Sequence, residues 1–430
     1  MSSLRENSPT LSDQLRDARR RTQSLTGDLR GEQLFGPKLS IVNPVLWELG
    51  HVAWFQEHWC LRLRPDESLA DSLLKGSDAL YDSAKVAHDT RWDLPLPSLS
   101  GTLDYQERVL ERILERLETE ASDPWFVYFV QLAIFHEDMH AEAFHYTRQT
   151  LGYSDPLQST ASAENAGTEE LRGDTEVAGG TYLVGASRNS GFHFDNEKWA
   201  HPVTVTPFRI ARAPVTNREF LEFVREGGYR RRDWWSAEGW ERKQASMPRY
   251  WKGGGDEWLE RRFLDWVPLE PDLPVMHVDW HEANAYCRYA GRRLPTEAEW
   301  EIAASVAEAG VRRRYPWGNS NDGGRANLGG RGRAPVDAYA SGDSYGGCRQ
   351  MIGNVWEWTS SAFEPYPGFV SDPYREYSEP WFGTHKVLRG GSFTTPARLI
   401  ANSWRNFYQP DRGDVFAGFR TCAAEGERPT

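Results

Sequence analysis

Apolar positions in the first third of the chain recur with the period of an α-helix. From Leu11 to Leu151 this period predicts four long helices separated by polar breaks. The expected limits are a cap at Ser12-Asp13 for the first helix, a start at Asn43-Pro44 for the second, Thr102 to Glu118 for the third, and Pro124 to Thr150 for the fourth, which ends near Gly152. Four helices of this length predict a helical bundle.

The pattern changes in the middle of the chain. Ser154 to Glu176 contains small and polar residues with almost no large apolar side chain, which is typical of a linker. After Val177 the apolar runs are short, glycine and tryptophan are frequent, and only Asn217 to Glu226 and Trp280 to Ala290 have a helical period. This second half therefore predicts an α+β domain rich in loops.

The sequence thus predicts a multidomain protein. We expect an all-α domain at 11–153, a linker at 154–176 and an α+β domain at 177–425. Two long segments without a clear period, Asn321 to Ser344 and Phe363 to Phe382, are expected to form the wall of a functional site or to be held in place by ligands. The same loops are candidate positions for a structural calcium ion.

Composition excludes several classes of protein. The net charge of -12 over 430 residues argues against a nucleic-acid partner, because phosphate binding requires a concentrated basic surface. The chain has a polar start and no apolar run near the roughly 20 residues that span a bilayer, so we expect no membrane association and a cytoplasmic location. The four cysteines are widely spaced, which argues against a disulfide framework or a thiolate zinc site.

Three histidines form a candidate metal site. His136 and His140 are four residues apart on a predicted helix, so their side chains project from one face about one turn apart. Alone, such a pair is equally compatible with two ordinary structural histidines. His51 lies on the apolar second helix, where an imidazole needs a partner, and facing helices of bundles commonly build metal sites. His58 and His145 are spare candidates.

Three neutral imidazoles leave up to three coordination positions open on an octahedral metal. This arrangement suits iron(II) that must bind a substrate and dioxygen, whereas a structural zinc site requires a fourth protein ligand.

The same residues permit a competing interpretation, since 136–140 (HEDMH) matches the H-E-x-x-H signature of zinc proteases. The extended form of that signature requires a glycine and a histidine where this chain has Ala143 and Tyr146. A third ligand would have to be Glu164 or Glu169, both inside the predicted linker. We therefore treat the zinc hydrolase as the minor alternative.

Seven ordered motifs in the second half carry a resemblance to a known family. They are 179–185 (GGTYLVG), 214–220 (PVTNREF), 274–280 (PVMHVDW), 293–300 (RLPTEAEW), 315–319 (YPWGN), 353–359 (GNVWEWT) and 388–393 (LRGGSF). Together they resemble the sulfatase-modifying-factor fold of the formylglycine-generating enzymes, which is related to C-type lectins. Those enzymes need two cysteines shortly after the last motif, where this chain has Thr394-Thr395-Pro396-Ala397. The resemblance therefore implies the fold without that activity.

A sulfatase-modifying-factor domain that follows a DinB-like four-helix bundle resembles the ergothioneine-pathway sulfoxide synthases and the selenoneine synthases. This resemblance covers almost the whole chain and implies that His51, His136 and His140 bind Fe(2+). It implies a reaction in which dioxygen drives formation of a carbon-sulfur or carbon-selenium bond at imidazole C2 of hercynine, which is trimethylhistidine. A loop tyrosine acts as proton donor in this family, and Tyr366 is the best match here.

The resemblance also implies substrate contacts near the C-terminus, at Arg405, Asn406, Phe407 and Tyr408. The residue types agree with this, since a trimethylammonium group favours aromatic faces. Trp404 fits the core equally well. Lys85 and Arg91 lie where the family often contacts the sulfur or selenium donor, although a solvated loop is an equal interpretation.

Two departures from one type of sulfoxide synthase bear on the donor. That type has Trp-Asp where this chain has Phe407-Tyr408, and Gln where it has Met139. Together with the motif at 43–48 (NPVLWE), these residues favour the selenoneine branch and a selenosugar donor. The alternatives are a sulfoxide synthase that uses cysteine or γ-glutamylcysteine, and a module that binds small molecules without catalysis.

Overall fold

The computed structural model describes residues 9–157, 171–188, 190–243, 245–321, 323–330 and 332–424. The chain divides into two compact units, Met1–Leu157 and Gln158–Thr430. Within the described ranges, no helix is both long and apolar enough to cross a lipid bilayer. The four cysteines are free and buried.

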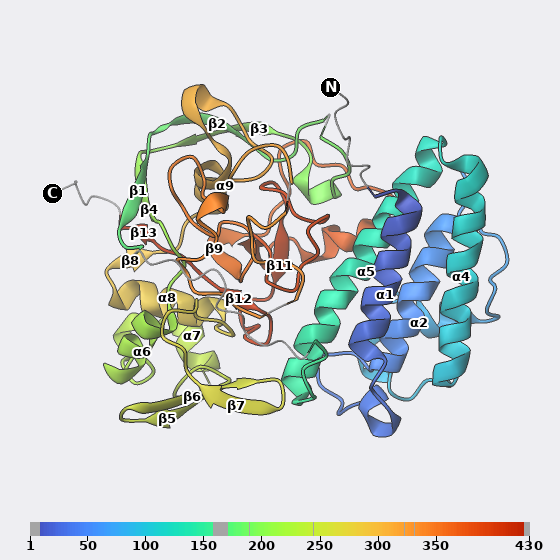
Figure 1. Cartoon of the computed structure of the whole chain (residues 1–430), viewed down its shortest axis with the longest axis horizontal. Coiled ribbons are helices and arrows are strands. Elements are labelled where there is room, and N and C mark those ends of the chain that lie inside the picture. Colours follow the sequence, from blue (N-terminus) through green and yellow to red (C-terminus); the bar gives the residue numbers. More distant parts are fainter. Residues whose placement is uncertain are drawn as a thin grey trace, which may run out of the picture. The chain divides into compact units, whose positions relative to one another are not determined.

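The first unit is a bundle in which four long helices run side by side (Figure 1). They are α1 (Leu11–Thr26), α2 (Val45–Glu57), α4 (Leu99–Glu120) and α5 (Pro124–Leu151), joined by shorter turns that include α3 (Ser77–Tyr81) and a π-helical turn at His58–Arg62. Helix α1 packs on α5, and α2 packs on both α4 and α5. The predicted bundle is confirmed.

Local sequence explains where these helices begin and end. Asp123 caps α5 through its side chain, Pro124 occupies the first turn, and Gly152 ends the helix with a φ of 68°. The expected cap of α1 at Ser12-Asp13 is wrong, because Thr10 caps the helix and Asp13 completes a reciprocal capping box with it. Every residue of α2 is buried, so this helix forms the centre of the bundle.

The second unit is α+β, and its described residues form four small sheets. Their strand orders are β1-β4-β13-β8, β11-β10-β9-β12, β2-β3 and β5-β6-β7. All pairs are antiparallel except β9 and β12. The strands are β1 (Asp174–Val177), β2 (Gly180–Val184), β3 (His201–Val205), β4 (Phe208–Ala211), β5 (Trp251–Gly254), β6 (Glu257–Arg262), β7 (Asp265–Pro268), β8 (Arg292–Arg293), β9 (Trp356–Ala362), β10 (Lys386–Arg389), β11 (Asn406–Tyr408), β12 (Ala417–Gly418) and β13 (Cys422–Ala423).

The helices of this unit include two that the sequence predicts and two that it does not. Helices α6 (Asn217–Arg225) and α8 (Trp280–Tyr289) confirm the prediction. The short α7 (Ala237–Arg242) and the buried α9 (Glu297–Ser305) are additional. Helix α9 has no apolar stripe because all of its sides pack against protein, and its Trp300 lies in the core with Phe208 and Met351 of other segments.

The predicted linker needs a correction at its second end. Strand β1 begins at Asp174, inside the range expected to be linker, and pairs with β4 along its whole length. Pairing with a strand about 35 residues later is a long-range contact that local composition does not report. At the first end, Ser154 accepts a hydrogen bond from Arg148 of α5 through its backbone oxygen, at 3.0 Å. The central part, 158–170, which holds Glu164 and Glu169, lies outside the described residues.

Candidate metal centre

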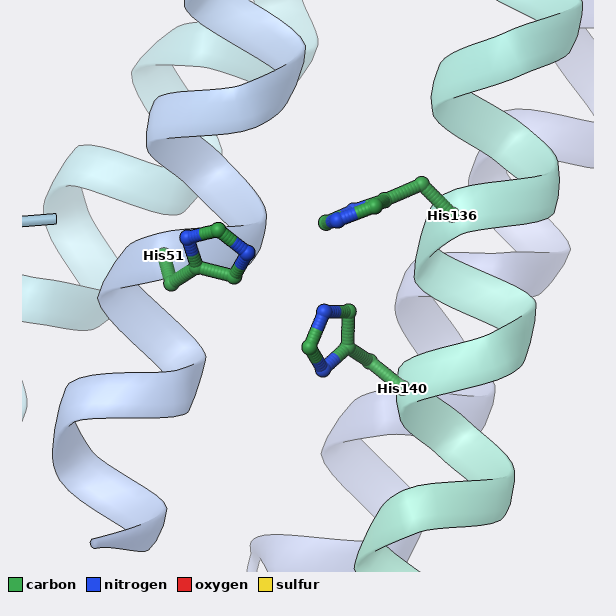
Figure 2. Close-up of side chains that lie close together, drawn as sticks. All are labelled: His51, His136 and His140. Carbon is green, nitrogen blue, oxygen red and sulfur yellow. The ribbon is translucent and has the colours of Figure 1, made fainter. Parts of the chain in front are cut away.

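The three predicted ligands meet inside the bundle. His51 projects from α2, and His136 and His140 project from α5 one turn apart, so that the three rings converge (Figure 2). One ring nitrogen of each histidine lies within 4.8 Å of the others, a spacing that a single metal ion can bridge. In the part of the chain that the structure describes, no second group of three or more His, Cys, Asp and Glu side chains has this geometry.

The position of His51 depends on the neighbouring turn that ends in Tyr81. The Nδ1 atom of His51 donates a hydrogen bond to the Tyr81 carbonyl oxygen at 2.8 Å. A carbonyl can only accept, so Nδ1 carries the proton and the lone pair of Nε2 is available to a metal. Gly50 allows this approach, because a Cβ atom there would lie 2.2 Å from the Tyr81 ring. Trp47 stacks on the other side of His51, with ring centres 4.9 Å apart.

His140 has a charged partner instead. Its Nδ1 atom lies 2.6 Å from the Oε1 atom of Glu48, a carboxylate that is 1% exposed. The carboxylate accepts a hydrogen bond from Nδ1–H of His140, which again leaves the lone pair of Nε2 available to a metal.

His136 is held by an aromatic ring. Phe55 of α2 stacks on it with ring centres 3.6 Å apart and an interplanar angle of 4°. Burial lowers the pKa of His136 well below its ordinary value, and the nearby His140 and His51 lower it further. Burial and His140 lower the pKa of His51 in the same way. Both rings are therefore neutral at physiological pH and can act as ligands.

Glu137 does not have the role that a zinc protease would require. Its carboxylate is fully buried and accepts hydrogen bonds from Arg19 Nε at 2.9 Å, Thr22 Oγ1 at 2.9 Å and Gln56 Nε2 at 2.6 Å. A carboxylate occupied by three donors, including a guanidinium, is a poor general base. The match to the protease signature therefore reflects a structural carboxylate that ties α5 to α1 and α2.

The donor set fits a metal that keeps open positions. Three imidazole nitrogens suit iron(II), and the Glu48 carboxylate is hydrogen-bonded to Nδ1 of His140. His58 and His145 lie outside the group. Burial lowers the pKa of His145 to about 4, and its Nδ1 atom lies 2.9 Å from the backbone oxygen of Ala141.

The three bundle residues predicted to contact a substrate have different surroundings. Lys85 is largely exposed and forms an ion pair with Asp82 at 2.7 Å. Arg91 is buried, with its guanidinium carbon 3.9 Å from the ring centre of Trp47, and burial lowers its pKa to about 10. Arg91 thus keeps its charge beside an aromatic ring that contacts His51. Met139 is half-buried, next to His140 on α5.

The predicted substrate contacts near the C-terminus lie on different faces of a β-strand. Asn406, Phe407 and Tyr408 form β11, the edge strand of its sheet. Because side chains alternate along a strand, Asn406 and Tyr408 share one face and Phe407 has the other. Phe407 stacks on Phe363 with ring centres 4.0 Å apart. The four residues therefore do not form one continuous surface.

Arg405 and Tyr366 meet in the interior of the second unit. Arg405 is 1% exposed, and its Nε atom donates to Glu297 of α9 at 2.6 Å. The Tyr366 hydroxyl donates to the same carboxylate at 3.2 Å, and the Arg405 guanidinium lies 4.0 Å from the centre of its ring. Burial, with Glu297 as the next cause, raises the pKa of Tyr366, so the phenol keeps its proton at neutral pH. In this conformation the proton points to Glu297.

Two residues of the site were not predicted from the sequence, namely Glu48 and Tyr81. Glu48 had a usable signal, because a lone acid in the apolar run of α2 needs a buried partner and lies one turn from His51. Tyr81 had no such signal, since its backbone oxygen makes the contact.

Comparison with known proteins agrees with both units. Residues 14–143 match the DinB superfamily, and residues 159–425 match the sulfatase-modifying factor enzyme 1-like domain. Fold and site together define a DinB-type helical bundle with a three-histidine group, followed by a sulfatase-modifying-factor domain. The second domain is also similar to the formylglycine-generating enzyme of Streptomyces coelicolor, with 32% identity over 63% of this chain and 95% of that enzyme.

The chain belongs to the hercynine oxygenase family. It is 38% identical to the hercynine oxygenase of Mycolicibacterium smegmatis, over 96% of this chain and 98% of that protein. It is also 38% identical to the hercynine oxygenase of Mycobacterium tuberculosis, over 88% of this chain and 91% of that protein. The similarity spans both units, which confirms the family predicted from the sequence.

Proposed function

We propose that this protein is an iron(II)- and dioxygen-dependent enzyme that joins a sulfur or selenium atom to C2 of the imidazole ring of hercynine. The observation that carries the proposal is the convergence of His51, His136 and His140, with two Nε2 atoms freed for a metal by hydrogen bonds at Nδ1. Similarity along the full length to two hercynine oxygenases supports hercynine and dioxygen as substrates.

Iron(II) bound by the three histidines would supply the redox chemistry that couples dioxygen to the donor and the imidazole. The protein's own side chains bind and orient the substrates. Three ligands leave up to three positions for exchange. We assign Asn406 and Tyr408 to hercynine, because they share one face of β11 and an aromatic face suits a trimethylammonium group. Arg91 and Lys85 are assigned to an anionic or polar donor.

Tyr366 is the proposed proton donor, and its hydrogen bond to Glu297 sets a condition for that role. The raised pKa keeps the phenol protonated until it is needed, but the proton is directed at Glu297 in this conformation. Proton delivery to a substrate therefore requires the hydroxyl to leave Glu297. If it stays there, Tyr366 is a packing residue that donates a hydrogen bond to Glu297, the carboxylate that neutralises the buried Arg405.

We further propose a selenosugar as the donor. Tyr408 carries a phenol and Met139 a thioether, so neither position supplies a carboxylate or an amide for the ammonium group of an amino-acid donor. A hydroxylated sugar needs no such counter-charge and stacks well on an aromatic ring. The alternative is an ergothioneine-pathway sulfoxide synthase that uses cysteine or γ-glutamylcysteine.

One experiment tests both levels of the proposal. The iron-loaded protein is incubated with hercynine, dioxygen and equal concentrations of cysteine, γ-glutamylcysteine and a selenosugar, and the products are identified by mass. Dioxygen uptake that depends on hercynine is expected, with the carbon-selenium product dominant. A sulfoxide as the main product would overturn the selenosugar assignment, and absence of any hercynine-derived product with iron bound would overturn the proposed function.

A further inference from the structure

The three histidines of the metal centre differ in what supports them. His51 is backed by the neutral carbonyl of Tyr81, and His136 is stacked on the ring of Phe55. His140 is backed by the carboxylate of Glu48 at 2.6 Å. This ion-pair contact links a carboxylate to the three-histidine group.

The carboxylate beside His140 changes the electrostatics of the three-histidine group. Three neutral imidazoles do not reduce the charge of a divalent ion, and burying an uncompensated charge is costly. Glu48 is 1% exposed, so solvent screens it little, and it can offset one unit of that charge through His140. A charge-assisted hydrogen bond at Nδ1 also increases the basicity of Nε2.

Glu48 also orients the His140 ring, because of its position on α2. It precedes His51 by three residues on α2, so the two side chains lie on the same face about one turn apart. Its hydrogen bond reaches across to α5, which carries His140. One carboxylate on the helix of the first ligand therefore fixes the ring of the third ligand on the opposite helix.

We propose that Glu48 is the positioning residue of the metal centre, one that orients His140 and supplies the negative charge that retains a divalent ion. The inference rests on the proposed function, because it presumes that the three histidines hold a metal. Glu48 is not a member of the three-histidine group and acts through its hydrogen bond with His140.

The test compares metal affinity in three variants of the full chain. Glu48→Ala removes both the charge and the acceptor, whereas Glu48→Gln keeps an acceptor oxygen without the charge. The matched control is Glu57→Gln, on the same helix, where a fully buried carboxylate accepts a hydrogen bond from the Tyr105 hydroxyl at 2.5 Å and does not contact a ligand. Cobalt(II) is titrated without oxygen and followed by its visible absorption, and the unfolding of each metal-free variant is measured separately.

Glu48→Ala is expected to weaken cobalt(II) binding by roughly 10- to 100-fold, and Glu48→Gln by a smaller factor with a shifted absorption band. Glu57→Gln is expected to bind cobalt(II) like the wild type even if its unfolding transition moves. Wild-type affinity and spectrum in both Glu48 variants would overturn the inference and leave the proposed function intact. Failure of the wild type to bind cobalt(II) or iron(II) would instead overturn the metal centre itself.

Discussion

Gly50 offers a sharp test of how the bundle holds His51. In Gly50→Ala the added Cβ atom would lie 2.2 Å from Cζ, 2.3 Å from Cε1 and 2.5 Å from the hydroxyl oxygen of Tyr81. Ordinary carbon contacts begin near 3.4 Å, so the ring must retreat by about 1 Å. Tyr81 is fully buried, so the ring cannot swing into solvent and its backbone must move with it.

That movement acts directly on the metal ligand. The hydrogen bond between His51 and the Tyr81 carbonyl is 2.8 Å long, and a retreat of about 1 Å would break it. Overpacking of this kind costs roughly 1–3 kcal/mol, and the gain of about 1 kcal/mol from replacing glycine in a helix offsets part of it. We therefore expect a net loss of up to about 2 kcal/mol in unfolding free energy. Loss of the supporting hydrogen bond is expected to weaken metal binding by roughly tenfold or more.

The assay is a cobalt(II) titration combined with urea unfolding of the metal-free protein. Gly101→Ala in α4 is the control, because its new Cβ would make ordinary contacts of 3.4 and 3.5 Å. This control is expected to be slightly more stable and to bind metal normally. The double variant Gly50→Ala/Tyr81→Ala removes the ring but keeps the carbonyl, so it should recover much of the lost affinity. Wild-type metal affinity in Gly50→Ala would refute the reasoning.

Four further predictions concern single side chains. Alanine substitution of each clustered histidine (His51→Ala, His136→Ala or His140→Ala) should abolish iron binding, measured by metal analysis, and leave the circular dichroism spectrum of the fold intact. Wild-type iron content in any of these variants would remove that residue from the site. Glu137→Gln should keep its metal and much of its activity but unfold more easily, because the carboxylate serves Arg19 and Gln56; a metal-loaded but inactive variant would revive the zinc-hydrolase alternative. Tyr366→Phe should retain iron and hercynine while coupling slows, and an unchanged rate and product ratio would make Tyr366 a packing residue. The folded pKa of His145 is about 4, below its unfolded value of 6.5, so its contribution to stability is present above pH 6.5 and is lost as the pH falls toward 4. This contribution to the unfolding free energy is roughly 3 kcal/mol at most. The metal-free His145→Leu variant should therefore lose less stability than the wild type between pH 6.5 and 4.

The cluster of three histidines could be predicted from the sequence because its signal is local. The spacing of His136 and His140 is a helix property, and the apolar run around His51 marks a buried imidazole. Helix α9 was missed because it is buried on all sides and has no apolar stripe. A usable signal was nevertheless present, since Thr296 and Glu299 form a capping box, a pattern readable in the sequence.

Other parts of the site depend on contacts between distant segments. The carbonyl of Tyr81 meets His51 across 30 residues, and Arg405 meets Glu297 across 108. Neither pairing follows from residue type or spacing. By contrast, the separation of Asn406 from Phe407 follows from strand periodicity alone, once the segment is assigned as a strand.

The three proposed metal ligands come from two helices, α2 and α5, and this arrangement would link metal binding to the stability of the folded bundle. A ligand that binds the folded chain and not the unfolded chain adds to folding stability, by about 2.7 kcal/mol when its free concentration is 100 times the dissociation constant. If the three histidines hold a metal, its binding and the docking of α5 on α2 would stabilise each other. Under metal starvation the bundle should open more often, so that proteases remove empty chains faster than loaded ones.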